Sequence, residues 1–138
     1  AGQSRWRGSA EVDGPSFDVR LNRAIVSKGS AAEVLTFAEA HALEFDEVHF
    51  VTALHRVAKH GGASLGADRT LEWILRSVGA FVAGMNSRHL ANTVWAVARL
   101  AFGHPPLLHA LAESARPTIQ DFRPPELAST AWSCAALL

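Results

Sequence analysis

Apolar residues recur along much of this chain at the spacing of an α-helix. The clearest run keeps the spacing i, i+3, i+4, i+7 for four turns and consists of Leu71, Ile74, Leu75, Val78, Phe81, Val82 and Met85. No segment alternates apolar and polar residues for long enough to predict a strand. The pattern therefore predicts an all-α fold.

Residues able to cap a helix precede the apolar runs. Ser30 with Glu33 forms a capping box, and Asp46 and Asp68 can each accept hydrogen bonds from the free N–H groups of a first turn. Asn86 or Ser87 starts the fourth helix. Proline pairs open the last two helices, since proline is tolerated in a first turn. The expected helices cover about 30–43, 46–60, 68–85, 86–102, 105–117 and 124–138, which form pairs over about 30–60, 68–102 and 105–138.

A phrase of similar residues recurs in the second helix of each pair. It begins at Phe45, returns 40 residues later at Met85 and 37 residues after that at Phe122. Its apolar sixth place and its small fourteenth place are occupied by Phe50, Leu90 and Leu127 and by Ala58, Ala98 and Ala135. Repeats of this length are typical of stacked helix pairs, each of which buries its apolar face against its neighbours. The sequence predicts a short right-handed α-solenoid of three helix-turn-helix repeats, which we expect to continue past Leu138.

Two segments do not fit the helical pattern. Residues 1–28 lack a sustained period and mix Gly, Ser, Arg and acidic residues, so we expect an extended, flexible N-terminal arm before a repeat domain over 29–138. The string Gly62-Ala-Ser64-Leu-Gly66 matches the G-x-S-x-G nucleophile elbow, but that elbow needs a preceding strand. A helix is expected before it, so we interpret the glycines as a loop.

Composition narrows the function classes. The 13 basic and 13 acidic residues give a formal net charge of zero, which argues against binding nucleic acid by bulk charge but leaves room for a local basic stripe. The single cysteine, Cys134, excludes an internal disulfide, and it projects with Leu127 onto the expected buried face as a small core residue. No apolar run reaches the roughly 18 residues of a membrane span.

No residues point to catalysis or to metal binding. His55 and His60 are five residues apart and so do not share a helix face, and no cysteine or carboxylate at ligand spacing completes a metal site. We therefore expect no enzyme, no metal, no cofactor and no small-molecule substrate.

The repeated phrase carries a family resemblance. Leu90-Ala-Asn-Thr-Val-Trp-Ala-Val-Ala and Leu127-Ala-Ser-Thr-Ala-Trp-Ser-Cys-Ala resemble the LANTxWAxA helix of octotricopeptide and FAST-kinase-like repeats, which often precede a RAP domain in organelle proteins. The segments 21–26 and 45–59 resemble the start of such arrays, so the resemblance covers about residues 20–138. It implies a helix-pair solenoid in a mitochondrion or a plastid such as the chloroplast, tied to organellar RNA metabolism or translation. It implies no kinase chemistry, and no RAP-like segment is present.

Projecting the second helix of each repeat at about 100° per residue predicts which side of the helix is available to bind a partner. In the second repeat Leu90, Val94, Val97 and Ala101 form the expected buried face, and Arg88, Asn92, Trp95 and Arg99 lie opposite it. Stacking the repeats builds a small polar ladder (Thr52, Asn92, Ser129), an aromatic ladder (His55, Trp95, Trp132) and a basic ladder (Lys59, Arg99) that Ala136 interrupts.

Hydrogen-bonding groups beside flat rings and arginines suit single-stranded RNA. The expected RNA-binding residues are Arg56, Lys59, Arg88, Asn92, Trp95, Arg99, Arg123 and Trp132. The alternative for the tryptophans is that they fill the seam between neighbouring repeats.

Two functions follow as expectations. The first is a non-catalytic helical-repeat module of an organelle that associates with single-stranded or ribosomal RNA. The second is a structural subunit that docks onto protein subunits of a large organelle assembly, such as a mitochondrial ribosome or a photosynthetic complex.

Overall fold

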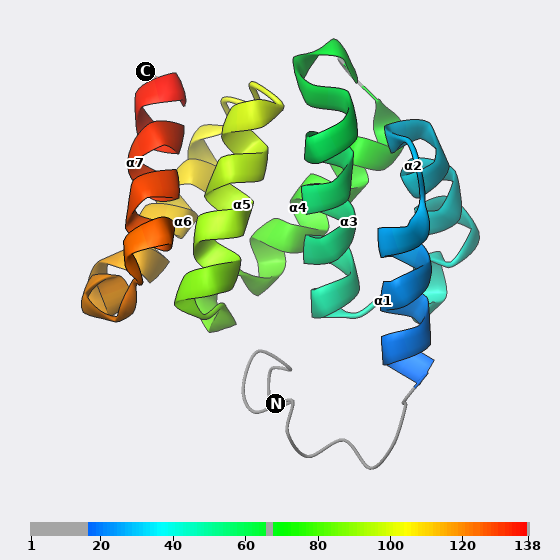
Figure 1. The fold of residues 1–138 in the computed structure, drawn as a ribbon, viewed down its shortest axis with the longest axis horizontal. Coiled ribbons are helices and arrows are strands. Elements are labelled where there is room, and N and C mark those ends of the chain that lie inside the picture. Colours follow the sequence, from blue (N-terminus) through cyan, green and yellow to red (C-terminus); the bar gives the residue numbers. More distant parts are fainter. Residues whose placement is uncertain (1–16, 66–67, 138) are drawn as a thin grey trace.

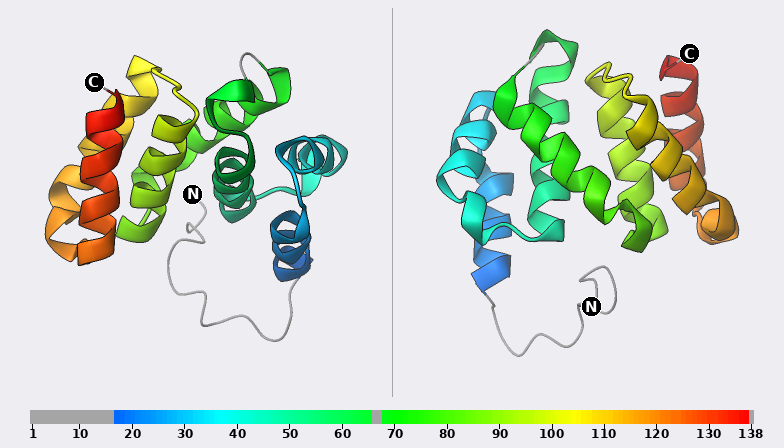
Figure 2. Two further views of the ribbon diagram at one scale, coloured as in Figure 1. Left: turned by 45° about the horizontal axis from the view of Figure 1, so that its top comes forward. Right: turned by 180° about the vertical axis from the view of Figure 1, so that it is seen from behind.

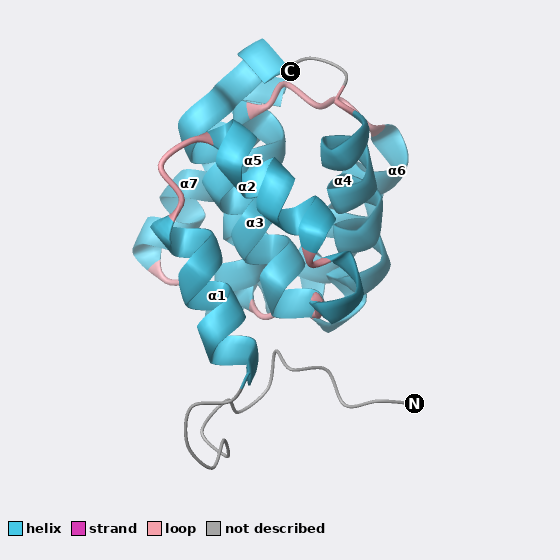
Figure 3. Ribbon diagram, turned by 90° about the vertical axis from the view of Figure 1, so that its right-hand side faces the viewer, coloured by secondary structure: helices cyan, strands magenta, loops and turns pink. Residues whose placement is uncertain are grey.

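The chain folds into α-helices joined by short connections. The computed structural model describes residues 17–65 and 68–137. Its helices are α1 (Phe17–Ser27), α2 (Ala31–Ala40), α3 (Glu47–Gly61), α4 (Arg69–Phe81), α5 (Ser87–Arg99), α6 (Pro105–Ala115) and α7 (Pro124–Leu137). Short 3-10 turns follow α2, α3, α4 and α6, and the described residues contain no strand (Figure 3). The all-α prediction is therefore confirmed.

The helices lie in two layers. In Figure 1, α1, α3, α5 and α7 stand side by side and run in the same direction, and we call them the front layer. Figure 2 shows α2, α4 and α6 behind them, and these helices with their 3-10 turns form the back layer. Helix α3 contacts α1 and α5 within its own layer and α2 and α4 in the other. The right-handed solenoid itself stays a prediction.

The prediction of an extended arm is wrong for residues 17–27, which form α1. Leu21 and Ile25, one turn apart, are both buried, and α1 packs against α3. The helix was missed because charged residues interrupt its short apolar stripe. Residues 1–16 of the expected arm lie outside the described residues.

Helix starts agree with the capping residues named from the sequence. The Ser30 hydroxyl accepts from the Glu33 N–H, Asp68 from the Leu71 N–H, and Asn86 from the His89 N–H. The expected capping box at Ser30 is only half formed, because the Glu33 carboxylate accepts from the N–H of Gly29 instead.

A complete capping box occurs at α3, where the sequence had suggested only one acceptor. The Asp46 carboxylate accepts from the backbone N–H groups of Val48 at 3.0 Å and His49 at 3.2 Å. In return the Asp46 N–H donates to His49 Nδ1 at 2.9 Å, and the His49 side chain is fully buried. This histidine therefore fixes the start of α3.

The buried face expected for α5 is right at its centre and wrong at one end. Leu90 and Val97 are buried, and Val94 is half-buried. Ala101 is exposed with a φ of 55°, because α5 has already ended at Arg99. Ala91 and Ala96 are buried as well, since α5 lies between α3 and α7 and packs on both.

The expectation that Leu127 and Cys134 are core residues is wrong. Leu127 keeps 42% of its surface exposed, and Cys134 is exposed too. Projection placed them correctly on the side that α5 buries at Leu90 and Val97, but no described helix covers that side of α7. A periodic pattern gives the direction of a side chain and does not say whether a neighbour is present.

Candidate nucleic-acid interface

The helices of the two layers carry net charges of opposite sign, although the formal net charge of the whole chain is zero. The helices of the front layer contain six Lys and Arg (Arg20, Arg23, Arg56, Lys59, Arg88, Arg99) and three acidic residues (Asp18, Glu47, Glu126). The back layer contains three Arg (Arg69, Arg76, Arg116) and six acidic residues (Glu33, Glu39, Glu44, Glu72, Glu113, Asp121). A formal net charge of zero therefore hides a cationic layer and an anionic one.

The positive charge is densest on α3 and α5. These neighbouring helices carry four Lys and Arg and one acidic residue, Glu47, which lies in the first turn of α3. Lys59, Arg88 and Arg99 are exposed to solvent. Arg56 is half-buried, and its Nη2 lies 3.2 Å from His60 Nε2. The expected cations of the first two repeats thus occupy one layer.

His55 marks the place where three of these cations converge. Burial lowers the pKa of His55 below its usual value, and the positive charges of Arg56, Lys59 and Arg88 lower it further. Arg88 belongs to α5 and the others to α3, so the cluster spans the seam between repeats. Since the pKa is lowered, His55 is neutral at pH 7 and the positive charge belongs to the Lys and Arg side chains.

The aromatic ladder is continuous between the first two repeats. The ring centroids of His55 and Trp95 are 5.0 Å apart with an interplanar angle of 39°. Trp95 is half-buried and also packs against the hydrophobic core. It therefore fills the seam between α3 and α5, as the packing alternative predicts, while part of its ring faces solvent.

The third repeat contributes differently. Trp132 keeps 52% of its surface exposed, so it is accessible to a partner. Arg123 is exposed just before α7, where its backbone N–H donates to Glu126 at 2.8 Å. These two residues lie outside the cluster around His55, at the α7 side of the front layer.

The members of the small polar ladder are only partly accessible. Thr52, Asn92 and Ser129 are all half-buried. The Ser129 carbonyl accepts from the Ser133 hydroxyl at 2.7 Å, so its backbone already serves the helix. The structure therefore exposes the charges of Lys59, Arg88 and Arg99 and the ring of Trp132 more than it exposes these hydrogen-bonding side chains.

Sequence reasoning missed two basic residues of the front layer. Arg20 and Arg23 are exposed on α1, in the segment that had been expected to be an extended arm. The four-residue spacing of Leu21 and Ile25 was the available signal, because it predicts one helical face. With α1 included, the positive charge extends past α3 to the end of the layer.

His89 lies next to Arg88 on this surface and is half-buried. It occupies the first turn of α5, and burial, followed by the charge of Arg88, lowers its pKa to about 4. Within the described residues no three His, Cys, Asp or Glu side chains are grouped closely enough to hold a metal ion.

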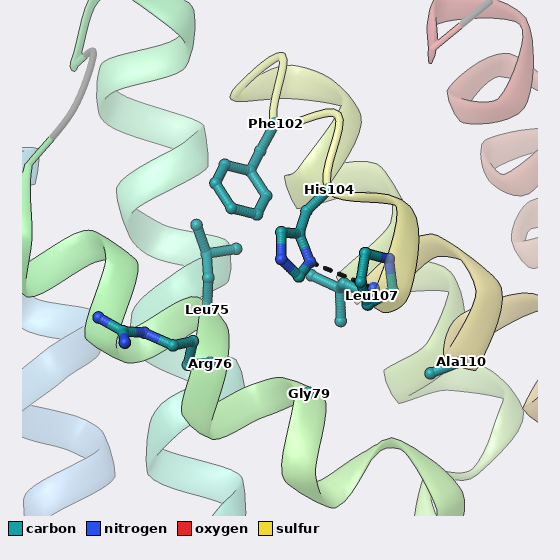
Figure 4. Close-up of a pocket in the computed structure, with 8 residues that line it drawn as sticks. Leu75, Arg76, Gly79, Phe102, His104, Leu107 and Ala110 are labelled. Atoms are coloured by element: carbon teal, nitrogen blue, oxygen red, sulfur yellow. Dashed lines mark hydrogen bonds between the residues drawn. The ribbon is translucent and has the colours of Figure 1, made fainter.

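A hollow of about 200 Å³ lies between α4 and α6 (Figure 4). Phe102 and His104 stack above it with ring centroids 5.4 Å apart, and Leu75 points toward Phe102. His104 Nδ1 accepts from the Leu107 N–H that opens α6, and Arg76 points away from the hollow. The polar groups are therefore turned to capping or to solvent, and none converges on a ligand.

Comparison with protein-family models, with curated proteins and with solved structures found no match to this chain. Among the helices that the structure describes, none has both the length and the apolar character needed to cross a membrane.

Proposed function

We propose that this protein is a non-catalytic helical module that associates with RNA through the front-layer surface of α3 and α5. The observation that carries the proposal is the segregation of charge between the layers, which gives a neutral chain one cationic face. A polyanion is attracted by such a face and repelled by the opposite one.

The chemistry of the face favours single strands. Arg88 and Arg99 stand near opposite ends of α5, with the half-exposed ring of Trp95 between them. Cations that follow a backbone beside a ring on which a base can stack are what single-stranded RNA requires. The resemblance of the repeated phrase to octotricopeptide repeats supports an organellar setting, a mitochondrion or a plastid, and a role in RNA metabolism or translation.

A titration against a fluorescent mixed-sequence single-stranded RNA at several salt concentrations tests the proposal. We expect the affinity to fall as salt rises, with a logarithmic slope of about −0.7 for each phosphate neutralised. Replacing two contacts through Arg88→Ala with Arg99→Ala should flatten the slope by roughly 1.4.

The back layer supplies a matched control. Arg69 and Arg76 are exposed on α4, so Arg69→Ala with Arg76→Ala removes the same charge from the opposite face. The control should bind RNA as the unchanged protein does. An equal loss of RNA affinity in the two double variants would mean that bulk charge alone causes binding. An absence of RNA binding at low salt would refute the proposal.

A second candidate function is a structural subunit docked in a larger assembly. It is favoured by the apolar residues that α7 exposes, Leu127 and Trp132 among them. A docking surface on α7 and a cationic surface on α3 and α5 occupy different parts of the molecule, so one protein can use both.

A further inference from the structure

The line along which α3 and α5 meet, which we call the central seam, carries two rings at its middle and cations toward its ends. His55 of α3 lies against Trp95 of α5, and both rings are half-buried. Lys59 and Arg99 each lie one turn beyond these rings. Arg88 lies two turns before Trp95, in the first turn of α5. The central seam therefore has positive charge on both sides of a pair of partly exposed rings.

The last turns of α3 and α5 lie side by side at one end of the central seam. The two helices run in the same direction (Figure 1). A methyl group on Gly62, which ends α3, would lie 3.9 Å from the carbonyl oxygen of Arg99. This contact places Lys59 and Arg99 at the same end of the seam, whereas Arg88 belongs to the other end.

The cations of the central seam lack acidic partners in the part of the chain that the structure describes. Lys59, Arg88 and Arg99 form no ion pair there with a carboxylate. In the back layer, by contrast, Arg116 pairs with Glu113 at 2.9 Å. Because like charges held near one another repel, an anion bound between the seam cations stabilises their arrangement.

The distance between the cations sets the length of RNA that fits. Arg88 and Arg99 are eleven residues apart on one helix, which rises about 1.5 Å per residue and so separates them by about 16 Å. A base-stacked strand advances about 3.4 Å per nucleotide, so this distance holds about five nucleotides. Domains that bind double-stranded RNA contact about 16 base pairs. The central seam is therefore suited to a short unpaired segment.

A strand that crossed the front layer from α1 to α7 would meet less of this chemistry. Helix α7 contains no Lys or Arg, so such a strand would leave the cations after α5. The nearest exposed cations at the two sides of the layer are Arg23 on α1 and Arg123 just before α7. Packed helices are about 8–10 Å apart, so a strand over all four would need roughly eight nucleotides.

We propose that RNA binds along the central seam, parallel to the helix axes, as an unpaired segment of about five nucleotides. The middle of the segment lies over His55 and Trp95. Its phosphates contact Arg88 at one end and Lys59 and Arg99 at the other. The inference rests on the function proposed above, to which it adds the class of RNA and the direction of the strand.

Fluorescein-labelled oligouridylates of 3, 6, 9 and 12 nucleotides test the length of the site. Each is titrated with the protein at several salt concentrations. We expect the salt slope to steepen from 3 to 6 nucleotides and to stay constant from 6 to 12, because phosphates beyond the seam are not neutralised. An RNA duplex of 12 base pairs should compete about tenfold or more weakly than the strand of 6, since paired bases cannot stack on the rings.

Two double variants with the same loss of charge test the direction of the strand. Arg88→Ala with Arg99→Ala should flatten the salt slope for the strand of 6 nucleotides by roughly 1.4, which makes the affinity about 25-fold weaker at 0.1 M salt. Arg23→Ala with Arg123→Ala removes cations from the two sides of the front layer and should bind as the unchanged protein does. All four side chains are exposed, and urea denaturation checks that both variants stay folded.

A constant slope beyond 6 nucleotides, with the loss confined to the variant of Arg88 and Arg99, supports the proposal. A slope that steepens up to 12 nucleotides overturns it, as does equal competition by the duplex. An equal loss in the variant of Arg23 and Arg123 also overturns it, while RNA binding itself stands. If no oligouridylate binds at low salt, the proposed function fails and the inference fails with it.

Discussion

Acidification should destabilise this protein through His89 well before most carboxylates are protonated. Burial and the neighbouring charge of Arg88 lower the pKa of His89 from 6.5 to about 4 in the folded chain. Between these two values the unfolded chain binds a proton that the folded chain does not, so the free energy of unfolding rises with pH. The stability from the neutral ring is fully present above pH 6.5 and is lost as pH falls toward 4.

The size of the effect follows from the two pKa values. From pH 8 to pH 5 the single site at His89 contributes a loss of about 2 kcal/mol, an upper figure because the ring is partly exposed and solvent screens the effect. His55, whose pKa is also lowered, adds a loss of the same sign. Urea denaturation at pH 5, 6, 7 and 8 measures the combined loss from His89 and His55. A slope of the free energy of unfolding against urea concentration that stays the same at each pH supports two-state unfolding.

The variant His89→Gln isolates the contribution of this residue. Glutamine suits the third position of a helix and does not titrate, so its stability should fall less between pH 8 and pH 5 by up to about 2 kcal/mol. The same fall in both proteins would refute the reasoning. An NMR titration that placed the pKa of His89 near 6.5 in the folded chain would refute it directly.

Two further substitutions test the local structure by urea denaturation. Asp46→Ala removes the acceptor for the N–H groups of Val48 and His49 and should lower the free energy of unfolding by about 1–2 kcal/mol. Asp46→Asn keeps an acceptor and should lower it less. Equal losses in the two variants would count against the cap. Gly62 has φ 57° and ψ −154°, which side chains rarely adopt, so Gly62→Ala should cost roughly 1–3 kcal/mol. Gly29→Ala, with open space around the new methyl group, should be near neutral, and equal effects at the two glycines would contradict the strain.

Much of the fold could be predicted because its information is local. Ser30, Asp46, Asp68 and Asn86 each cap the helix that the sequence assigned to them. Capping and apolar periodicity depend on residues within a turn or two, which a single sequence displays. Helix α1 was missed because it carries little of this local information. Leu21 and Ile25 give it only a short apolar stripe, and packing on α3 stabilises it.

The candidate site was less predictable because it depends on neighbours. Projection put Arg88 and Arg99 on an exposed side, and the structure agrees. It also put Cys134 in the core, where the structure disagrees, because burial requires a covering helix that the repeat pattern does not guarantee. To predict the contrast in charge between the layers, one must know that alternate helices lie in opposite layers. No single motif in the sequence gives that arrangement.

The position of α3 in the stack has a consequence for how the protein opens. Helix α3 is contacted by four other helices, whereas the described structure flanks α7 on one side only. In arrays where units contact mainly their neighbours, unfolding can begin at an end and travel inward. Backbone amides of α7 should therefore exchange with deuterium earliest and those of α3 last, so that local openings at one end leave the centre intact.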